Sequence, residues 1–274
     1  AVLAGCWFSD RHASRPVNFI EQCLCLTRDT LWGARAGDPI QLPDFHEWHI
    51  VRPIFGWRRE DGTRRFRRVS IWVPKKHAKS FLASELGIYL TIADREASAE
   101  VICVAKARHQ AGQVHDVART LVRNSPSKKL KRRVEIIDSR KLISYRGPKS
   151  LPSIFHAMAS DADTSEGRDA SAVIFDELHV GSRKLYEALQ YSGRARRQPL
   201  FISISTAGEY EPDSIGWQEY ETAVHIHDGT LSDPYTYVYL AKAAERGDWF
   251  AANPEADDDW TDPEVLKKAN PGWD

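Results

Sequence analysis

The chain has 274 residues, 42% of them hydrophobic, which suits one large domain with a buried core. Lys and Arg total 38, as do Asp and Glu, so the net charge of zero excludes a partner prediction from charge balance alone. Four cysteines without zinc-like spacing exclude a disulfide scaffold and favour a reducing, intracellular location, and no apolar run approaches the roughly 20 residues of a membrane helix.

The first elements are predicted to be helical. Residues 1–43 read as an N-terminal lead-in with a short amphipathic stretch at 18–26. Residues 44–57 carry apolar and aromatic groups at helical spacing and end near a glycine. The turn signal at 60–63, between two basic arms, favours a hairpin.

From residue 66 the pattern changes to strands that alternate with helices. Strands are predicted over 68–73, 100–104, 134–137, 142–145, 171–175 and 200–205. Helices are predicted over 80–93, from the end of the strand 100–104 to about residue 123, and over 185–191. Runs that are apolar on both faces predict an α/β sheet covered by helices. The sheet signal fades after Gly208. We therefore expect one main α/β domain over 44–230 and a lid or linker over 231–274.

A phosphate-binding loop is predicted at residues 73–80, between a strand and a helix, with the sequence Val-Pro-Lys-Lys-His-Ala-Lys-Ser. In a P-loop of the pattern GxxxxGK[ST], the Lys reaches the phosphates and the hydroxyl binds Mg²⁺, which predicts these roles for Lys79 and Ser80. Val73 and Ala78 stand at the two glycine positions. Taken alone, Lys-Ser before a helix is more often the solvated start of that helix.

Two later segments support the loop. An apolar strand over 172–176 ends in Asp176 and Glu177, as in a Walker B segment, where Asp176 would hold Mg²⁺ and Glu177 would deprotonate the attacking water. A further strand ends in Ser205-Thr206-Ala207-Gly208, and Thr206 is placed to sense the γ-phosphate. Each has a plain alternative, an acidic turn or a capped turn. Their order along the chain favours ATP binding.

The ordered motifs resemble the large terminase subunit of tailed bacteriophages from about residue 33 onward. The resemblance rests on Trp48-His49, Ile54-Phe55-Gly56-Trp57, residues 75–80, Asp176-Glu177-Leu178-His179, Ser205-Thr206-Ala207-Gly208, residues 214–220 and residues 259–271. It implies a P-loop NTPase fold of the ASCE, RecA-like type, with a mostly parallel sheet and helices on both faces. It also implies that Trp48 and His49 contact adenine and that Lys75, Lys76, His77 and Ala78 line the phosphates.

The resemblance implies a Mg²⁺-dependent ATPase that drives double-stranded DNA into a procapsid. It would work in the host cytoplasm as a homo-oligomeric ring, with a portal protein and a small terminase subunit as partners. Relatives carry an RNase H-like nuclease domain, which we expect beyond residue 274. A helicase-like ATPase and a degenerate, non-hydrolysing module that binds DNA or portal remain alternatives. A helicase would need a second motor domain, and intact Lys79 and Glu177 argue against the module.

Three positions depart from the family pattern, and the arginine that completes the site is open. His49 stands where the resemblance expects Gln, Lys75 where it expects Arg, and Ala78 where it expects Gly, which restricts the loop if φ must be positive. Arg168 is the first candidate for an arginine finger from the same or a neighbouring subunit. The competing candidates are Arg194, Arg196 and Arg197.

Basic residues gather in two stretches, 58–68 and 128–133. A translocase must ignore the bases, so its contacts with DNA should be electrostatic, independent of sequence and steeply dependent on salt. The stretch 128–133 is the candidate surface. A solvated loop explains it equally well.

Overall fold

The computed structural model describes residues 5–30, 33–105, 107–147, 151–159, 168–206, 208, 211–243, 257–259 and 261–272. The strands of its main sheet are β3 (Arg68–Trp72), β4 (Glu100–Ala105), β5 (Val134–Ile137), β6 (Leu142–Tyr145), β7 (Ser153–Ala159), β8 (Ala172–Asp176), β9 (Leu200–Ser205) and β10 (Thr236–Leu240). Their order across this 8-stranded sheet is β10-β3-β9-β8-β4-β7-β6-β5. Neighbours from β10 to β7 are parallel, whereas β6 and β5 complete the edge in antiparallel pairs.

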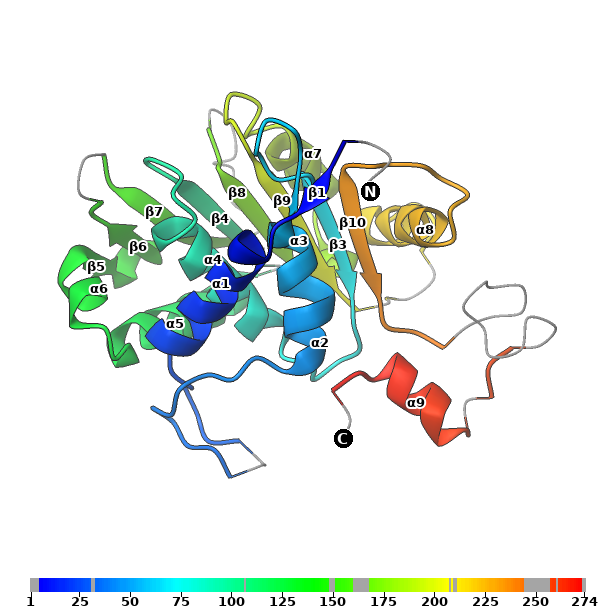
Figure 1. Ribbon diagram of the computed structural model, residues 1–274, viewed down its shortest axis with the longest axis horizontal. Helices are drawn as coiled ribbons and strands as arrows, with labels where there is room; N and C mark the ends of the chain where they lie inside the picture. Colours follow the sequence, from blue (N-terminus) through cyan, green and yellow to red (C-terminus); the bar gives the residue numbers. More distant parts are fainter. Residues whose placement is uncertain are drawn as a thin grey trace.

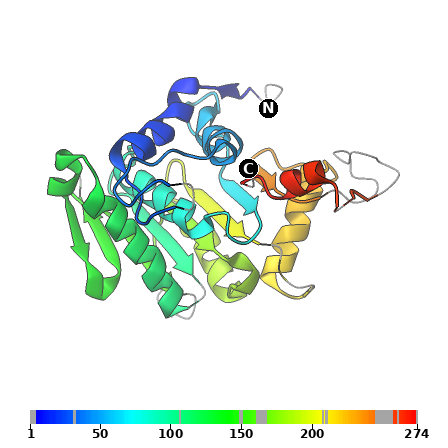
Figure 2. The same ribbon diagram turned by 90° about the horizontal axis from the view of Figure 1, so that it is seen from below.

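Helices cover both faces of this sheet (Figures 1 and 2). One face carries α1 (Asp10–Cys23), α3 (Arg52–Gly56), α4 (Lys79–Ile92) and α5 (Arg108–Asn124), and the other carries α7 (Arg183–Gln190) and α8 (Ile215–His227). Shorter elements are α2 (Asp44–His46), the π-helix η2 (Glu47–Val51), α6 (Lys128–Arg133), the 3₁₀ turns η3 (Asp138–Arg140) and η4 (Leu178–Val180), and α9 (Pro263–Ala269). Strands β1 (Trp7–Phe8) and β2 (Trp57–Arg58) form a small antiparallel pair.

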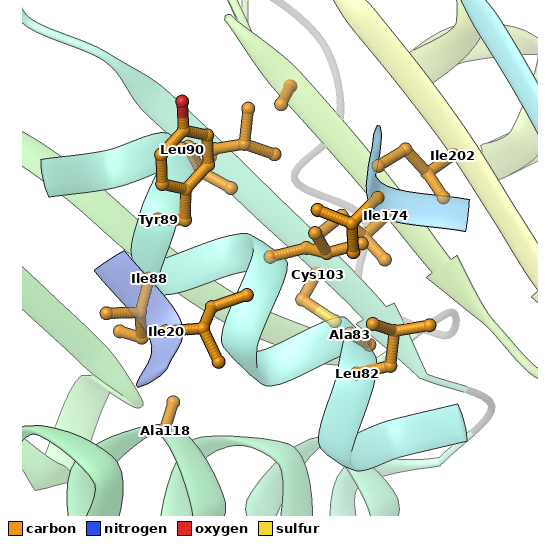
Figure 3. Close-up of a cluster of buried hydrophobic side chains, with 14 of the residues drawn as sticks. Ile20, Leu82, Ala83, Ile88, Tyr89, Leu90, Cys103, Ala118, Ile174 and Ile202 are labelled. Carbon is orange, nitrogen blue, oxygen red and sulfur yellow. The ribbon is translucent and has the colours of Figure 1, made fainter. Parts of the chain in front are cut away.

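The central strands are apolar on both sides because each face is covered. Along β4, Val101 and Cys103 enter the core beneath α4, whereas Ile102 and Val104 enter the core beneath α7. Figure 3 shows the first core, where side chains of α4 meet those of β4, β8 and β9. Helix α4 fits closely because a Cβ atom at Gly87 would lie 2.4 Å from the ring of Phe155 on β7. Helix α4 therefore packs directly against the sheet at Gly87.

The α/β fold class and most predicted strands and helices are confirmed, but two strands of the main sheet, β7 and β10, were missed. Strand β7 lies between β4 and β6, and only Ile154 and Phe155 of its sequence Ser-Ile-Phe-His-Ala-Met-Ala favour a strand strongly, so its β pattern is short. Strand β10 pairs in parallel with β3, so the expectation that the sheet ends near Gly208 is wrong. The division of the chain at residue 230 stays a prediction, although the part beyond it supplies a sheet strand.

Both ends of the described chain pack onto this body. Ala13, Val17 and Ile20 of α1 are buried, so the lead-in belongs to the core. Near the other end, a Cβ atom at Gly272 would lie 3.2 Å from the rings of Phe45 and His77, so this segment lies beside α2. The predicted hairpin at 60–63 is a tight turn closed by one bridge, Arg58 to Arg64. Trp260 and Ala207 lie outside the described residues. None of the helices that the structure describes has the length and apolarity to span a bilayer.

Candidate nucleotide site

The ends of three neighbouring strands bring the predicted site residues together. In the parallel register, Trp72 at the end of β3 pairs with Ser205 of β9, and Asp176 of β8 pairs with Ile204. The loop 73–78 leaves β3 at this edge and leads directly into α4. Carboxyl ends of parallel strands are where open α/β sheets place their ligands. The geometry thus joins segments that are about a hundred residues apart in sequence.

The loop 73–78 folds with two left-handed residues that are not glycine. Lys76 has φ 71°, and Ala78, the N-cap of α4, has φ 53° and ψ 28°. The loop is tied to β9 by a 3.0 Å hydrogen bond that the Val73 amide donates to the Ser205 carbonyl. Turns of this kind at a helix N-terminus form concave nests of backbone N–H groups that suit an anion. Because φ is positive at Ala78, alanine in place of glycine restricts the backbone of the loop at this residue.

Lys79 lies folded against the loop. Its side chain is only 6% exposed, and its Nζ donates to the Pro74 carbonyl at 3.2 Å. The same ammonium lies 3.5 Å from Oε1 of Glu177. A buried ammonium needs negative partners, and phosphate oxygens entering the nest would supply them.

Asp176 has the chemistry of a metal ligand. It is 4% exposed, and burial raises the pKa of its carboxyl to about 6, although a hydrogen bond from the Ser80 hydroxyl and the charge of Lys79 lower this pKa in part. Its Oδ1 is buried and finds no hydrogen-bond partner among the described residues. A buried carboxylate oxygen beside a hydroxyl is the kind of hard oxygen donor that Mg²⁺ takes. Asp176 and Ser80 therefore fit the predicted metal.

Glu177 stands at the turn that follows β8. Its backbone is left-handed, with φ 62°, and its amide donates to the Ile204 carbonyl at 2.8 Å. Its carboxylate lies between Lys79 and His179, whose Nδ1 is 3.2 Å from Oε2. The side chain is 27% exposed, so a water molecule can reach it. Sequence reasoning included His179 in the motif Asp176-Glu177-Leu178-His179 but gave it no role.

The end of β9 contributes a second orphaned polar atom. Thr206 is 4% exposed, and its hydroxyl oxygen has no hydrogen-bond partner in the described ranges. Ser205 precedes it, beside the start of the phosphate loop. A buried hydroxyl without a partner at the carboxyl edge of the sheet suits the predicted contact with a terminal phosphate.

The π-helix η2, which carries Trp48 and His49, follows directly after α2. Phe45, just before η2, contacts His77 with ring centroids 6.0 Å apart. The His49 ring stacks on Tyr239 of β10, with centroids 5.9 Å apart and an interplanar angle of 6°. Trp48 is 55% exposed and carries the Arg52 guanidinium 4.3 Å from its ring centroid. Insertions of π-helix frequently mark functional sites. The contact with adenine stays a prediction.

All four arginine-finger candidates lie at the opposite end of the strands. Arg168 pairs with Glu100 at 2.7 Å, where β4 begins. It precedes β8 and Glu177 follows it, and a strand of this length spans about 13 Å at a rise of about 3.3 Å per residue. Arg196 pairs with Asp169 at 3.0 Å, Arg197 donates to the Asp61 carbonyl, and Arg194 lies over Tyr191. Arg168 therefore lies away from the site of its own chain, so its predicted role as an arginine finger would fall at the site of a neighbouring subunit. A role across a subunit boundary remains a prediction.

The fold and the convergent Lys79, Ser80, Asp176 and Glu177 define a P-loop NTPase domain. Residues 44–224, more than half of the chain, match the family described as "Terminase large subunit, ATPase domain", and the chain belongs to this family. The resemblance read from the motifs is thereby confirmed, as is the fold class.

The chain is also similar to several known proteins. The large terminase of bacteriophage HK97 is 19% identical, with a TM-score of 0.72 over 95% of this chain and 48% of that one. The large terminase ATPase domain of Thermus phage P74-26 is 16% identical, with a TM-score of 0.48 over 66% of this chain and 78% of that one. Protein YmfN of Escherichia coli is 29% identical over 107 residues, 39% of this chain and 21% of YmfN. The chain thus spans only part of the HK97 protein and of YmfN.

Proposed function

We propose that this chain binds and hydrolyses ATP and is the motor domain that drives double-stranded DNA into a procapsid. The observation that carries the proposal is the convergence of Lys79, Ser80, Asp176 and Glu177 at the carboxyl ends of the strands. There Oδ1 of Asp176 is buried and has no hydrogen-bond partner among the residues that the structure describes. If Asp176 had only a structural role, the free-energy cost of burying Oδ1 away from water would not be offset by any hydrogen bond or metal ion. Membership of the terminase ATPase family supports the same function.

The residues divide the chemistry of hydrolysis among them. Lys79 and the backbone N–H groups of the loop would bind the β- and γ-phosphates, and Thr206 would contact the γ-phosphate. Ser80 and Asp176 would hold Mg²⁺, which neutralises charge on the phosphates when bound. Glu177 accepts a proton from water as the water oxygen bonds to the γ-phosphorus and the bond to the bridging oxygen breaks. ADP and inorganic phosphate leave.

The wider setting of this motor is also proposed. Its partners would be double-stranded DNA, a portal protein and a small terminase subunit, and it would act in the host cytoplasm as a ring of identical subunits. In a ring, Arg168 or a neighbouring arginine would reach the site of the next subunit, because all four lie away from the site of their own chain.

ATP hydrolysis by site variants tests the proposal. We expect turnover by the parent with Mg²⁺ and linear DNA, its loss together with nucleotide binding in Lys79→Ala, and its loss with binding retained in Glu177→Gln. Lys184→Ala and Glu187→Gln, which change exposed residues of α7, serve as matched controls and should resemble the parent.

The alternatives predict different results. A non-hydrolysing module predicts a parent that binds DNA without turnover, and it would replace the motor proposal. A helicase-like ATPase predicts strand separation of duplex DNA by the active parent. If the parent neither binds nor hydrolyses ATP and behaves like both site variants, the proposed function is wrong.

A further inference from the structure

His179 joins the carboxylate of Glu177 to the end of β9. Its Nδ1 lies 3.2 Å from Glu177 Oε2 and 2.9 Å from Ser205 Oγ. Its backbone amide also donates to Ser205 Oγ, at 3.1 Å. One histidine thus contacts both the candidate general base and the strand end that carries Thr206.

The contact with Glu177 selects the tautomer of His179. A carboxylate oxygen only accepts hydrogen bonds, so the 3.2 Å approach of Nδ1 to Oε2 is a hydrogen bond when Nδ1 carries the proton, and we assign the proton to Nδ1 on this ground. With that tautomer, Ser205 Oγ accepts from both the backbone amide and the Nδ1–H of His179. The hydroxyl proton of Ser205 is then directed to the Thr206 carbonyl at 3.1 Å.

The position of His179 is held by its packing. A Cβ atom on Gly216 of α8 would lie 2.4 Å from Cα of His179, and one on Gly208 would lie 3.0 Å from its Cβ. Leu178, the preceding residue, is fully buried. Two glycines allow this close approach, which holds Cα and Cβ of His179 in place beside the left-handed turn at Glu177.

We propose that His179 is a positioning residue for hydrolysis. Its Nδ1–H holds Oε2 of Glu177 and leaves Oε1, the oxygen that faces Lys79, to accept the proton of the attacking water. Because Ser205 shares the same N–H, a shift of the end of β9 on contact with the γ-phosphate is passed to the carboxylate. This role rests on the proposed ATP hydrolysis and adds the group that orients its base.

Steady-state kinetics of two side-chain amides test the role of Nδ1. In His179→Asn the amide nitrogen can take the place of Nδ1, whereas in His179→Gln it reaches the place of Nε2. We expect His179→Ala and His179→Gln to lower kcat by about 10- to 100-fold, taking as a guide the cost of losing the hydrogen-bond partner that orients a metal ligand. The KM for ATP should change less than about threefold, and His179→Asn should recover most of kcat.

A double variant tests the link to β9. Ser205→Ala should lower kcat on its own, and its effect should shrink when His179 is already Ala, because both changes break one connection. His225→Ala, an exposed histidine at the end of α8, is the control and should keep the parental kcat. Thermal unfolding and ATP binding of each variant separate loss of fold from loss of orientation.

The outcomes separate this inference from the proposed function. If the parent shows no ATP turnover, the proposed function itself is wrong. An active parent together with an unchanged kcat in His179→Ala, or equal losses in His179→Asn and His179→Gln, overturns the positioning role alone. Nitrogen-15 NMR of the parent gives an independent readout, since a His179 ring protonated at Nε2 and not at Nδ1 would contradict the hydrogen-bond assignment.

Discussion

Arg64 and Asp94 form an ion pair of 2.6 Å in which only 2% and 5% of the two side chains are exposed. Arg64 follows the tight turn after β2, and Asp94 follows the end of α4. The guanidinium also donates to the Gln198 carbonyl at 2.6 Å, just before β9. One buried arginine therefore joins three segments at the edge of the sheet away from the phosphate loop.

Asp94→Asn should be strongly destabilising. Arg58 is buried close by, and burial together with the charge of Arg64 lowers its pKa to about 10. Without Asp94, two buried guanidinium groups lose a nearby negative charge, and we expect a loss of about 3–5 kcal/mol in the free energy of unfolding. Urea denaturation measures it. Glu135→Gln, which breaks an exposed pair with Arg146, should cost less than about 1 kcal/mol. Equal effects of the two changes would contradict the argument.

Ala78→Gly should stabilise the protein. Ala78 caps α4 in the left-handed region, where a Cβ atom costs about 1–2 kcal/mol, and glycine has no Cβ. Ala107→Gly is the matched control, since Ala107 caps α5 with an extended backbone at φ −130°. Both changes share the N-cap preference and the flexibility of glycine. We expect Ala78→Gly to exceed the control by about 1 kcal/mol in chemical denaturation. A difference near zero would mean that the loop relaxes in solution.

Glu85 should make stability fall as the pH rises. Its side chain in α4 is buried, and neither carboxyl oxygen finds a hydrogen-bond partner among the residues described. Burial raises its pKa from 4.5 to about 8. Between these values the folded state keeps a proton that the unfolded state loses, so stability is greatest at low pH and declines by up to about 1.4 kcal/mol per pH unit.

Glu85→Gln isolates this titration. The amide has no proton to lose in this range, so the decline in unfolding free energy between pH 5 and pH 8 should be several kcal/mol smaller than in the parent. Denaturant titrations at four pH values measure the slope. Glu187→Gln removes an exposed carboxylate and should leave the parental slope unchanged. A parental slope in Glu85→Gln would show that the carboxyl is solvated.

The local part of the site could be predicted from sequence, and the nonlocal part could not. Lys79 and Ser80 open a helix directly after an apolar strand, and Asp176 ends another, so each position follows from periodicity within about ten residues. The placement of Arg168 depends on whether the residues just before β8 lie at the same ends of the strands as the phosphate loop or at the opposite ends. Proximity to the Walker B strand in sequence suggested the site, but Arg168 precedes β8 and therefore lies at its far end.

The missing strands have a similar explanation. Strand β10 has a strong β pattern, Thr-Tyr-Val-Tyr-Leu, but it lies in the segment 231–274 that was predicted to be a lid or linker. Its place beside β3, more than 150 residues earlier, is set by pairing that no local pattern reveals. The role of His179 was out of reach for the same reason, because Ser205 meets it only after β8 and β9 pair.

Helix α6 offers a cluster of accessible cations for DNA. Lys128, Lys129, Lys131 and Arg132 are exposed, and no ion pair to them is found within the part of the chain that the structure describes. By contrast, arginines at the far end of the sheet, such as Arg196 and Arg168, are bound by carboxylates. Unpaired, exposed cations can release counterions from DNA phosphates.

Neutralising α6 should therefore weaken DNA binding and flatten its salt dependence. In Lys129→Gln/Lys131→Gln, the slope of log K against log salt should fall in magnitude by up to about 1.8, or about 0.9 for each DNA phosphate that the protein no longer neutralises. Lys184→Gln/Lys267→Gln removes the same charge from exposed positions on α7 and α9. Fluorescence anisotropy with random-sequence duplex DNA at several salt concentrations compares the two. If both pairs change the slope equally, DNA responds to total charge and α6 is an ordinary solvated helix.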